Sequence, residues 1–262
     1  MRPPNGPNDI EPPNVLNELN VVERQTANLP TRYPPPVPNA HFINLGRMEY
    51  NACWEVQRGL ARRLAAGEIP DTLLFVEHDP VLTLGAAFHE ENLLLTKDEY
   101  EGRGIAVVRT DRGGDVTYHG PNQLVIYPIF HVKEHGGDLH KWLRDLEEAV
   151  IRLLARFDLD GYRFPPNTGV WMNSKKVAAI GIKVSKWVNI HGIALNCDND
   201  LSPFDLIVPC GIPGYGVTSL TQEKGREVTI GDAMQEAVPA FEGVFGLEFE
   251  EVSLAKNREA GA

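Results

Sequence analysis

The sequence predicts an α/β or α+β fold in which helices flank a mixed β-sheet. Short apolar runs typical of buried strands interleave with longer stretches whose apolar residues follow helical spacing. Consecutive strand runs near residues 115–127 and 169–195 indicate antiparallel pairs, so the sheet is expected to be mixed. The 262 residues, 42% of them hydrophobic, suffice for one large domain or two small ones with a sizeable core.

The first third of the chain predicts an extension, a helix and two strands. Residues 1–40 are rich in proline, which favours extended structure, and are interpreted as a flexible or loosely docked extension. A helix is expected from Met48, because apolar residues recur there at helical spacing, and Gly67 is placed to end it. The runs TLLFVE (72–77) and IAVVR (105–109) are expected to be buried strands.

The remainder predicts strands around two helices. Strands are expected at 115–118 and 124–127, on either side of a Gly-Pro-Asn turn. Asp138 is placed to cap a long helix that reaches Phe157, and β-rich runs follow at 169–172, 177–184 and 187–195. Thr229 and Asp232 have capping-box spacing before a last helix. We therefore expect a single folded domain over residues 41–252 and a tail over 253–262.

Charge and cysteine content exclude several classes of protein. The formal net charge of −11 argues against a general nucleic-acid binder, which needs a clustered basic face. No apolar run approaches 18 residues, so no membrane span is expected. The N-terminus lacks a secretory apolar core and carries acidic residues that transit peptides avoid, which indicates a cytoplasmic protein. Three cysteines do not suggest a disulfide framework.

The segment RGGDVTYHGPNQLVIYP (112–128) is the densest candidate site. Its glycine pair allows close approach of a ligand to the backbone, and His119 is suited to proton transfer or hydrogen bonding. The alternative is a hairpin with turn glycines and a structural histidine. A second candidate is HGIA (191–194), where a glycine inside a strand indicates close backbone approach or, alternatively, a bend.

A lysine and a cysteine complete the candidate chemistry. In KKVAAIG (175–181), a lysine that enters a buried run is suited to proton transfer, which makes Lys176 a candidate. The alternative is that both lysines lie in an exposed turn, and this interpretation is favoured for Lys175 and, on the residues alone, for Lys176 as well. Cys210 stands between Pro209 and Gly211, where a turn exposes a thiol that a neighbouring cation can activate. Cys53 and Cys197 lack such a setting and are interpreted as buried thiols.

These segments together resemble one family. RGGDVTYHGPNQLVIYP, KVAAIG, HGIALN, NDLSPFDLIVPCGI and GVTSL follow in the order and spacing of the lipoyl(octanoyl) transferases, over roughly Asn44 to Leu247. The resemblance implies the fold of biotin and lipoate protein ligases, with Cys210 and Lys176 as the catalytic pair. The implied acyl-binding residues are Arg112, Gly113, Gly114, Asp115, Val116, Thr117, Tyr118, His119, Ala179, Ile180, Gly181, Gly192, Ile193 and Ala194. Asn122 departs from the family, which usually has glycine there.

The resemblance further implies transfer of an octanoyl or lipoyl group through a Cys210 thioester. The donor would be octanoyl-acyl carrier protein, and the acceptors lysines on lipoyl domains of 2-oxoacid dehydrogenase complexes and on the glycine cleavage H protein. No metal, nucleotide or other cofactor would be needed, and Arg62, Arg63, Lys183 and Lys186 are candidates for a basic docking edge. The alternatives are an ATP-dependent lipoate or biotin ligase and a noncatalytic module that binds carrier proteins.

Overall fold

The computed structural model describes residues 39–165, 167–209 and 215–254, all within one compact unit, Val37–Ala262. The helices are α1 (Tyr50–Ala65), α2 (Lys97–Gly102), α3 (Leu139–Ala155), α4 (Leu220–Lys224) and α5 (Ile230–Phe245), with short 3₁₀ helices η1 (Glu90–Asn92), η2 (Val132–His135) and η3 (Ser202–Leu206). None of the helices in the described part of the chain combines the length and apolar character needed to cross a bilayer.

Most of the strands form one mixed sheet. The eight-stranded sheet has the order β11-β1-β2-β6-β10-β9-β8-β7, made of β11 (Phe249–Glu251), β1 (Ala40–Met48), β2 (Thr72–His78), β6 (Gln123–Ile129), β10 (Val188–Asn196), β9 (Lys175–Ser185), β8 (Asn167–Met172) and β7 (Tyr162–Phe164). β1 runs parallel to β2 and β11, and the other pairs are antiparallel. The predicted mixed sheet with flanking helices is therefore confirmed.

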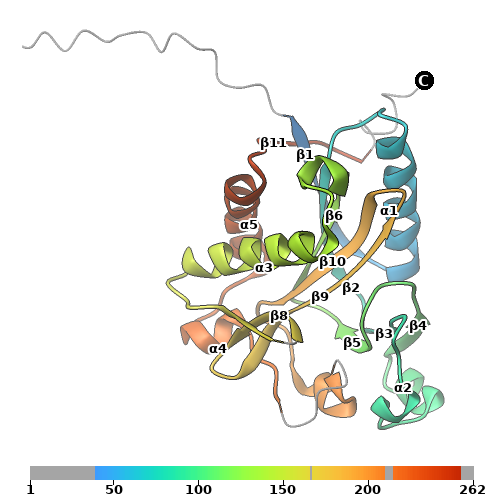
Figure 1. The fold of residues 1–262 in the computed structure, drawn as a ribbon. Coiled ribbons are helices and arrows are strands. Elements are labelled where there is room, and N and C mark those ends of the chain that lie inside the picture. The colour runs from blue at the N-terminus through green and yellow to red at the C-terminus, as the bar shows by residue number, and fades with distance from the viewer. Residues whose placement is uncertain (1–38, 166, 210–214, 255–262) are drawn as a thin grey trace, which may run out of the picture. The chain divides into compact units, whose positions relative to one another are not determined.

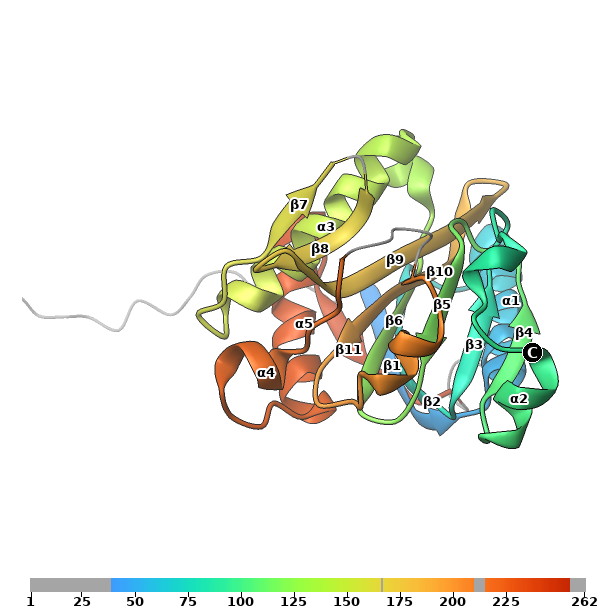
Figure 2. The same cartoon turned by 90° about the horizontal axis from the view of Figure 1, so that it is seen from below.

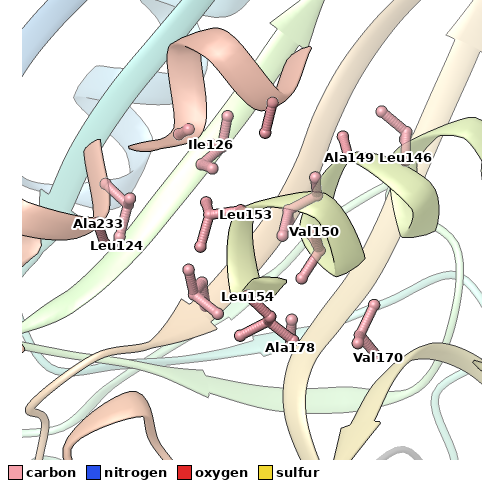
Figure 3. Close-up of a cluster of buried hydrophobic side chains, with 14 of the residues drawn as sticks. Leu124, Ile126, Leu146, Ala149, Val150, Leu153, Leu154, Val170, Ala178 and Ala233 are labelled. Atoms are coloured by element: carbon pink, nitrogen blue, oxygen red, sulfur yellow. The ribbon is translucent and has the colours of Figure 1, made fainter. Parts of the chain in front are cut away.

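Helices cover both faces of this sheet (Figure 1). α1 packs on the face of β6 and β10, and α3 and α5 pack together on the opposite face. Figure 3 shows the resulting core, in which Leu146, Val150 and Leu153 of α3 meet Leu124 and Ile126 of β6. Each large apolar side chain buried in this way contributes about 1.5–3 kcal/mol, so the α3 interface holds these strands firmly in place.

The predicted starts of α3 and α5 are confirmed, whereas the helix expected from Met48 begins at Tyr50, because Met48 still belongs to β1 and Glu49 caps the helix. Asp138 caps α3 by accepting hydrogen bonds from the backbone N–H groups of His140 and Lys141. Thr229 and Asp232 form the expected capping box at the start of α5. Leu139 is 46% exposed although it is apolar. It is the first residue of α3, where the apolar face has not yet reached the sheet.

The predicted antiparallel pairing across residues 115–127 is wrong. β5 (Val116–His119) belongs to a separate three-stranded sheet of order β4-β3-β5, in which it pairs with β3 (Val81–Leu84), and β4 is Ala106–Arg109. After the turn, β6 enters the large sheet between β2 and β10. Asn122 adopts φ +64° in that turn, which asparagine tolerates better than most residues. Every residue of β5 and β6 is buried, so no polar alternation marks their partners.

Candidate active site

Four small residues on β9 and β10 form the floor of a cavity. Gly181 lies opposite Gly192, and Ala179 lies opposite Ala194, so the two pairs occupy alternate positions of the antiparallel register and share one face of the sheet. Side chains alternate across a strand, so the neighbouring Ile180 and Ile193 point to the α3 side and contact its core. The sheet therefore presents almost no side-chain volume on its other face at this point, and the space above these residues remains open.

The loop 112–115 and strand β5 form the wall above this floor. Arg112 is buried, and its guanidinium donates to the Thr83 hydroxyl and to the backbone carbonyl of Asp115. The Gly113 amide donates to the carbonyl of Ile182 over 2.8 Å, which fastens the loop to the edge of β9. A Cβ atom on Gly181 would lie only 2.7 Å from the Gly113 carbonyl oxygen. The loop can approach β9 this closely because residue 181 is a glycine. Figure 2 shows the small sheet, including β5, beside β6 and β10.

The cavity has a volume of about 310 Å³, within the range of small-molecule sites. It is lined by twelve of the fourteen residues that the resemblance assigned to acyl binding: Arg112, Gly113, Gly114, Asp115, Thr117, His119, Ala179, Ile180, Gly181, Gly192, Ile193 and Ala194. The other two, Val116 and Tyr118, pack in the core of the small sheet, because alternate residues of β5 face opposite ways.

Lys176 lies at the end of the cavity where β9 begins. Its side chain is buried, with Nζ 5.0 Å from the centre of the Trp171 ring. Lys175 is exposed, as expected. The backbone of Lys176 forms two hydrogen bonds with the segment that follows the 210–214 region. Its N–H donates to the Gly216 carbonyl, and its carbonyl accepts from the Thr218 N–H. This segment therefore runs alongside the lysine.

Glu147 supports Lys176 through Gly169. Gly169 has φ +124°, and a Cβ there would lie 2.6 Å from the Ala178 carbonyl and 3.5 Å from two side-chain carbons of Lys176. The Gly169 amide donates to the carboxylate of Glu147, which is fully buried and also contacts Arg144 at 2.6 Å. The carboxylate on α3 thus fixes the strand against which the lysine packs.

A second, small cavity adjoins the first at Lys176. Its volume is about 10 Å³, roughly the space of one water molecule. It is lined by Thr117, Gln123, Lys176, Ala179, Ala194, Asn196, Phe204, Pro209 and Val217. Pro209 and Val217 stand on the two sides of the 210–214 region. Cys210 itself lies outside the described residues.

His119 is held neutral between two fixed partners. Burial lowers the pKa of His119 well below its usual range, and the nearby His78 and Arg112 act in the same direction. Its Nδ1 lies 2.9 Å from the Gln123 amide oxygen, so this nitrogen carries the proton. Its Nε2 lies 3.3 Å from the Thr83 hydroxyl, which is then the donor. Both ring nitrogens are engaged with protein groups, which suits His119 to shaping the wall.

Tyr50, Tyr127 and His191 also line the cavity, and the resemblance did not identify them as binding residues. The Tyr50 hydroxyl lies 3.4 Å from Nδ1 of His191, whose Nε2 lies 2.8 Å from the carboxylate of Asp111. Burial lowers the pKa of His191 to about 4, although Asp111 opposes this shift. His191 also adopts φ +58°, a strained conformation for a side chain with a Cβ atom. Tyr50 comes from a helix recognised only by its apolar spacing, and Tyr127 lies within the 112–128 segment but was not singled out there; their hydroxyl groups were the available signal.

Cys53 and Cys197 are buried, as expected. Burial raises the pKa of each thiol to about 12. Among the described residues, no group of three histidine, cysteine or carboxylate side chains is placed to hold a metal ion.

Comparison with known proteins identifies the family of this fold and site. The model of the lipoyl protein ligase A/B catalytic domain matches residues 49–242. An octanoyltransferase of Rubrobacter xylanophilus is 51% identical over 203 residues, which are 77% of this chain and 91% of that protein. An octanoyltransferase of Chloroflexus aggregans is 47% identical over 207 residues, 78% of this chain and 94% of that protein. The structure of a bipartite lipoate protein ligase from Thermoplasma acidophilum has a TM-score of 0.67 at 18% identity, covering 86% of this chain and 90% of that one.

Proposed function

The chain belongs to the lipoyl protein ligase A/B catalytic-domain family, and we propose that it carries its acyl group on Cys210 as a thioester. It is an acyltransferase that moves an octanoyl group in protein lipoylation, from an acyl donor to a lipoyl domain. Lys176 acts with Cys210 as the second member of a catalytic pair.

The position of Lys176 is the observation that carries the proposal. The lysine lies where the acyl-sized cavity meets the small one, and Pro209 lines that small cavity. Cys210 follows Pro209 directly in the sequence. On the other side of the region, Val217 forms a bridge with Lys176 itself. Both flanks of the 210–214 region thus lie beside the lysine, which supports the proposal that its ammonium group meets the Cys210 thiol.

The proposed reaction has two balanced half-reactions. In the first, the Cys210 thiolate forms a bond to the thioester carbonyl carbon, the bond to the donor sulfur breaks, and Lys176 gives its proton to the leaving thiolate. In the second, the amine of the acceptor lysine attacks the enzyme thioester, Lys176 takes a proton from that nitrogen, and the Cys210 thiolate leaves. The octanoyl thioester is already activated, so the proposed reaction consumes no nucleotide.

Burial of the acyl chain in the cavity supplies the free energy that binds it. An octanoyl group has six methylenes, each worth about 0.8 kcal/mol when buried, so full burial contributes about 5 kcal/mol. The floor of alanine and glycine leaves room for such a chain, and the buried aromatic rings of Tyr50 and Tyr127 line the same cavity. The cavity therefore favours a medium-length saturated acyl group over acetyl.

We propose octanoyl-acyl carrier protein as the donor, and as acceptors the lipoyl domains of 2-oxoacid dehydrogenase complexes and the H protein. Both partners are acidic, so a local basic edge is needed on a chain of net charge −11. Lys183 and Lys186 are exposed on the β9–β10 hairpin, directly beyond Ile182, which lines the cavity. Arg63, by contrast, is already paired with Glu68 at 3.1 Å. The hairpin lysines are the better candidates.

A reconstituted transfer reaction tests the proposal. Purified enzyme, octanoyl-acyl carrier protein and an apo lipoyl domain are mixed with EDTA and without nucleotide, and acylation of the acceptor lysine is followed by mass spectrometry. We expect transfer by the wild type and none by Cys210→Ser. Acylation that requires octanoate, ATP and magnesium would instead support the ligase alternative. Binding of the carrier without any transfer would support the noncatalytic module.

A further inference from the structure

Four residues line both cavities and so define the place where they meet: Thr117, Lys176, Ala179 and Ala194. The larger cavity has the volume and floor for an acyl chain, and the smaller one reaches Pro209, next to Cys210. In the function proposed above, the acyl chain occupies the larger cavity and the Cys210 thiol approaches from the smaller one. The reacting carbonyl then lies at this junction. Two of the four shared side chains, those of Thr117 and Lys176, can donate a hydrogen bond there.

The Thr117 side chain is oriented toward this junction by the strand that carries it. Its neighbours Val116 and Tyr118 pack in the core of the small sheet, so Thr117 faces the opposite way, into the cavities. Residue 117 is 7% exposed. No hydrogen bond links its hydroxyl to another described residue, and the side chain lines both cavities, where a bound molecule can reach it.

Thr83, which pairs with Thr117 in the register of β3 and β5, provides a contrast. Its hydroxyl accepts from Nε of Arg112 and lies 3.3 Å from Nε2 of His119. That hydroxyl is therefore used as both acceptor and donor by the protein itself. Of the two paired threonines, the one at the junction keeps its donor available for a bound molecule.

We propose that the Thr117 hydroxyl donates a hydrogen bond to the carbonyl oxygen of the acyl group and stabilises the oxyanion formed in both half-reactions. When the Cys210 thiolate bonds to the carbonyl carbon, the π electron pair moves to oxygen. When the carbonyl reforms, the carbon–sulfur bond to the donor breaks and its electron pair leaves with that sulfur. Thr117 keeps its proton throughout. A hydrogen bond to the negative oxygen is stronger than one to the neutral carbonyl, so it lowers the barrier.

The division of roles follows from the chemistry of the two donors. Lys176 has to give up and regain a proton, and a group that is deprotonated in part of the cycle cannot hold the oxyanion throughout. A threonine hydroxyl stays protonated at every stage. Thr117 therefore contacts the reacting atoms as a catalytic residue, separate from the thiol and the lysine.

The test compares Thr117→Val, which removes the hydroxyl at nearly constant shape, with Thr117→Ser, which keeps it. Two single-turnover rates are measured for each protein: formation of the octanoyl-enzyme from octanoyl-acyl carrier protein, and alkylation of Cys210 by iodoacetamide. Alkylation replaces iodide at a saturated carbon and forms no oxyanion. We expect Thr117→Val to slow acylation by about tenfold to a hundredfold, with the alkylation rate and the KM for the donor unchanged. Thr117→Ser should stay within a few-fold of wild type.

Thr72→Val is the matched control, because Thr72 is a fully buried strand threonine outside both cavities whose hydroxyl donates to the Pro70 carbonyl. It should lose about 1 kcal/mol of stability and acylate at the wild-type rate. Unchanged acylation by Thr117→Val would overturn the inference. So would equal slowing of acylation and alkylation, or equal losses in Thr117→Ser and Thr117→Val. A wild-type enzyme that forms no Cys210 adduct would overturn the proposed function itself.

Discussion

Gly181→Ala places a methyl group against the loop that carries Arg112. The added Cβ would lie 2.7 Å from the Gly113 carbonyl oxygen and 3.3 Å from Cδ of Arg112, whereas ordinary contacts begin at 3.4 Å. The loop must therefore withdraw by about 0.7 Å, the difference between 3.4 and 2.7 Å. The backbone angles of Gly181 are outside the left-handed region, so the conflict is one of space alone.

The expected cost follows from the contacts that this shift breaks. The hydrogen bond from the Gly113 amide to the Ile182 carbonyl, now 2.8 Å, would stretch to about 3.5 Å, beyond the usual range for N–H···O bonds. Loss of that bond costs about 0.5–1.5 kcal/mol, and overpacking adds about 1–3 kcal/mol. Replacing glycine in a strand returns about 0.5–1 kcal/mol. We expect a net loss of about 0.5–4 kcal/mol in the free energy of unfolding.

The effect on transfer should be larger than the effect on stability. The loop forms one wall of the cavity, and a misplacement near 1 Å can cost up to about a hundredfold in rate. We expect kcat/KM for octanoyl transfer to fall by about tenfold to a hundredfold, measured at subsaturating donor, with stability measured by urea unfolding. Gly59→Ala is the control, because a Cβ at this position in α1 meets nothing within 4 Å. Wild-type activity and stability in Gly181→Ala would refute the view that this glycine seats the loop.

Four further predictions concern the buried charges and thiols. Glu147→Gln removes the buried charge beside Arg144, and we expect a loss of about 2 kcal/mol in urea unfolding, below the value for a fully buried pair because that arginine is half-exposed. Because burial holds the pKa of His191 at about 4, below the ordinary 6.5, the unfolded state binds more protons between these values. Stability should therefore fall as the pH drops from 6.5 to 4, and His191→Gln should remove up to about 3 kcal/mol of that loss in urea titrations at several pH values. Because burial raises the pKa of Cys53 and Cys197 to about 12, native Cys210→Ser protein should resist iodoacetamide at pH 8 and react only after unfolding. Lys176→Met should raise the pH at which Cys210 is alkylated by about one unit, whereas Lys176→Arg should keep that profile and lose turnover; an unchanged profile in Lys176→Met would exclude the electrostatic role.

The elements that the sequence predicted well are those with clear periodicity or chemical boundaries. α3 has an apolar stripe and an aspartate cap, and α5 has a capping box, so their starts could be placed from the residues. β1, β3 and α2 were not predicted. β1 has an irregular burial pattern, β3 has four residues, and α2 is a short surface helix with one buried side chain. None of the three carries a long periodic signal.

Strand pairing and the depth of the site required the structure. β5 and β6 are buried at every position, and their pairing depends on β3, which lies more than thirty residues earlier in the chain. The motif residues of the cavity wall were predictable because glycine, arginine and histidine cluster there. Tyr50 and Tyr127 were not, because they look like core residues until the two sheets are placed together.

Intact-mass and peptide-mapping measurement after brief incubation with octanoyl-acyl carrier protein tests the central claim most directly. The account predicts that the wild-type enzyme gains one octanoyl group, that the group maps to Cys210, that hydroxylamine removes it, and that apo lipoyl domain discharges it onto a lysine. Cys53→Ser and Cys197→Ser should acquire the same adduct, and Cys210→Ser should acquire none. A fully active Cys210→Ser enzyme, or an adduct that maps to another residue, would contradict the account.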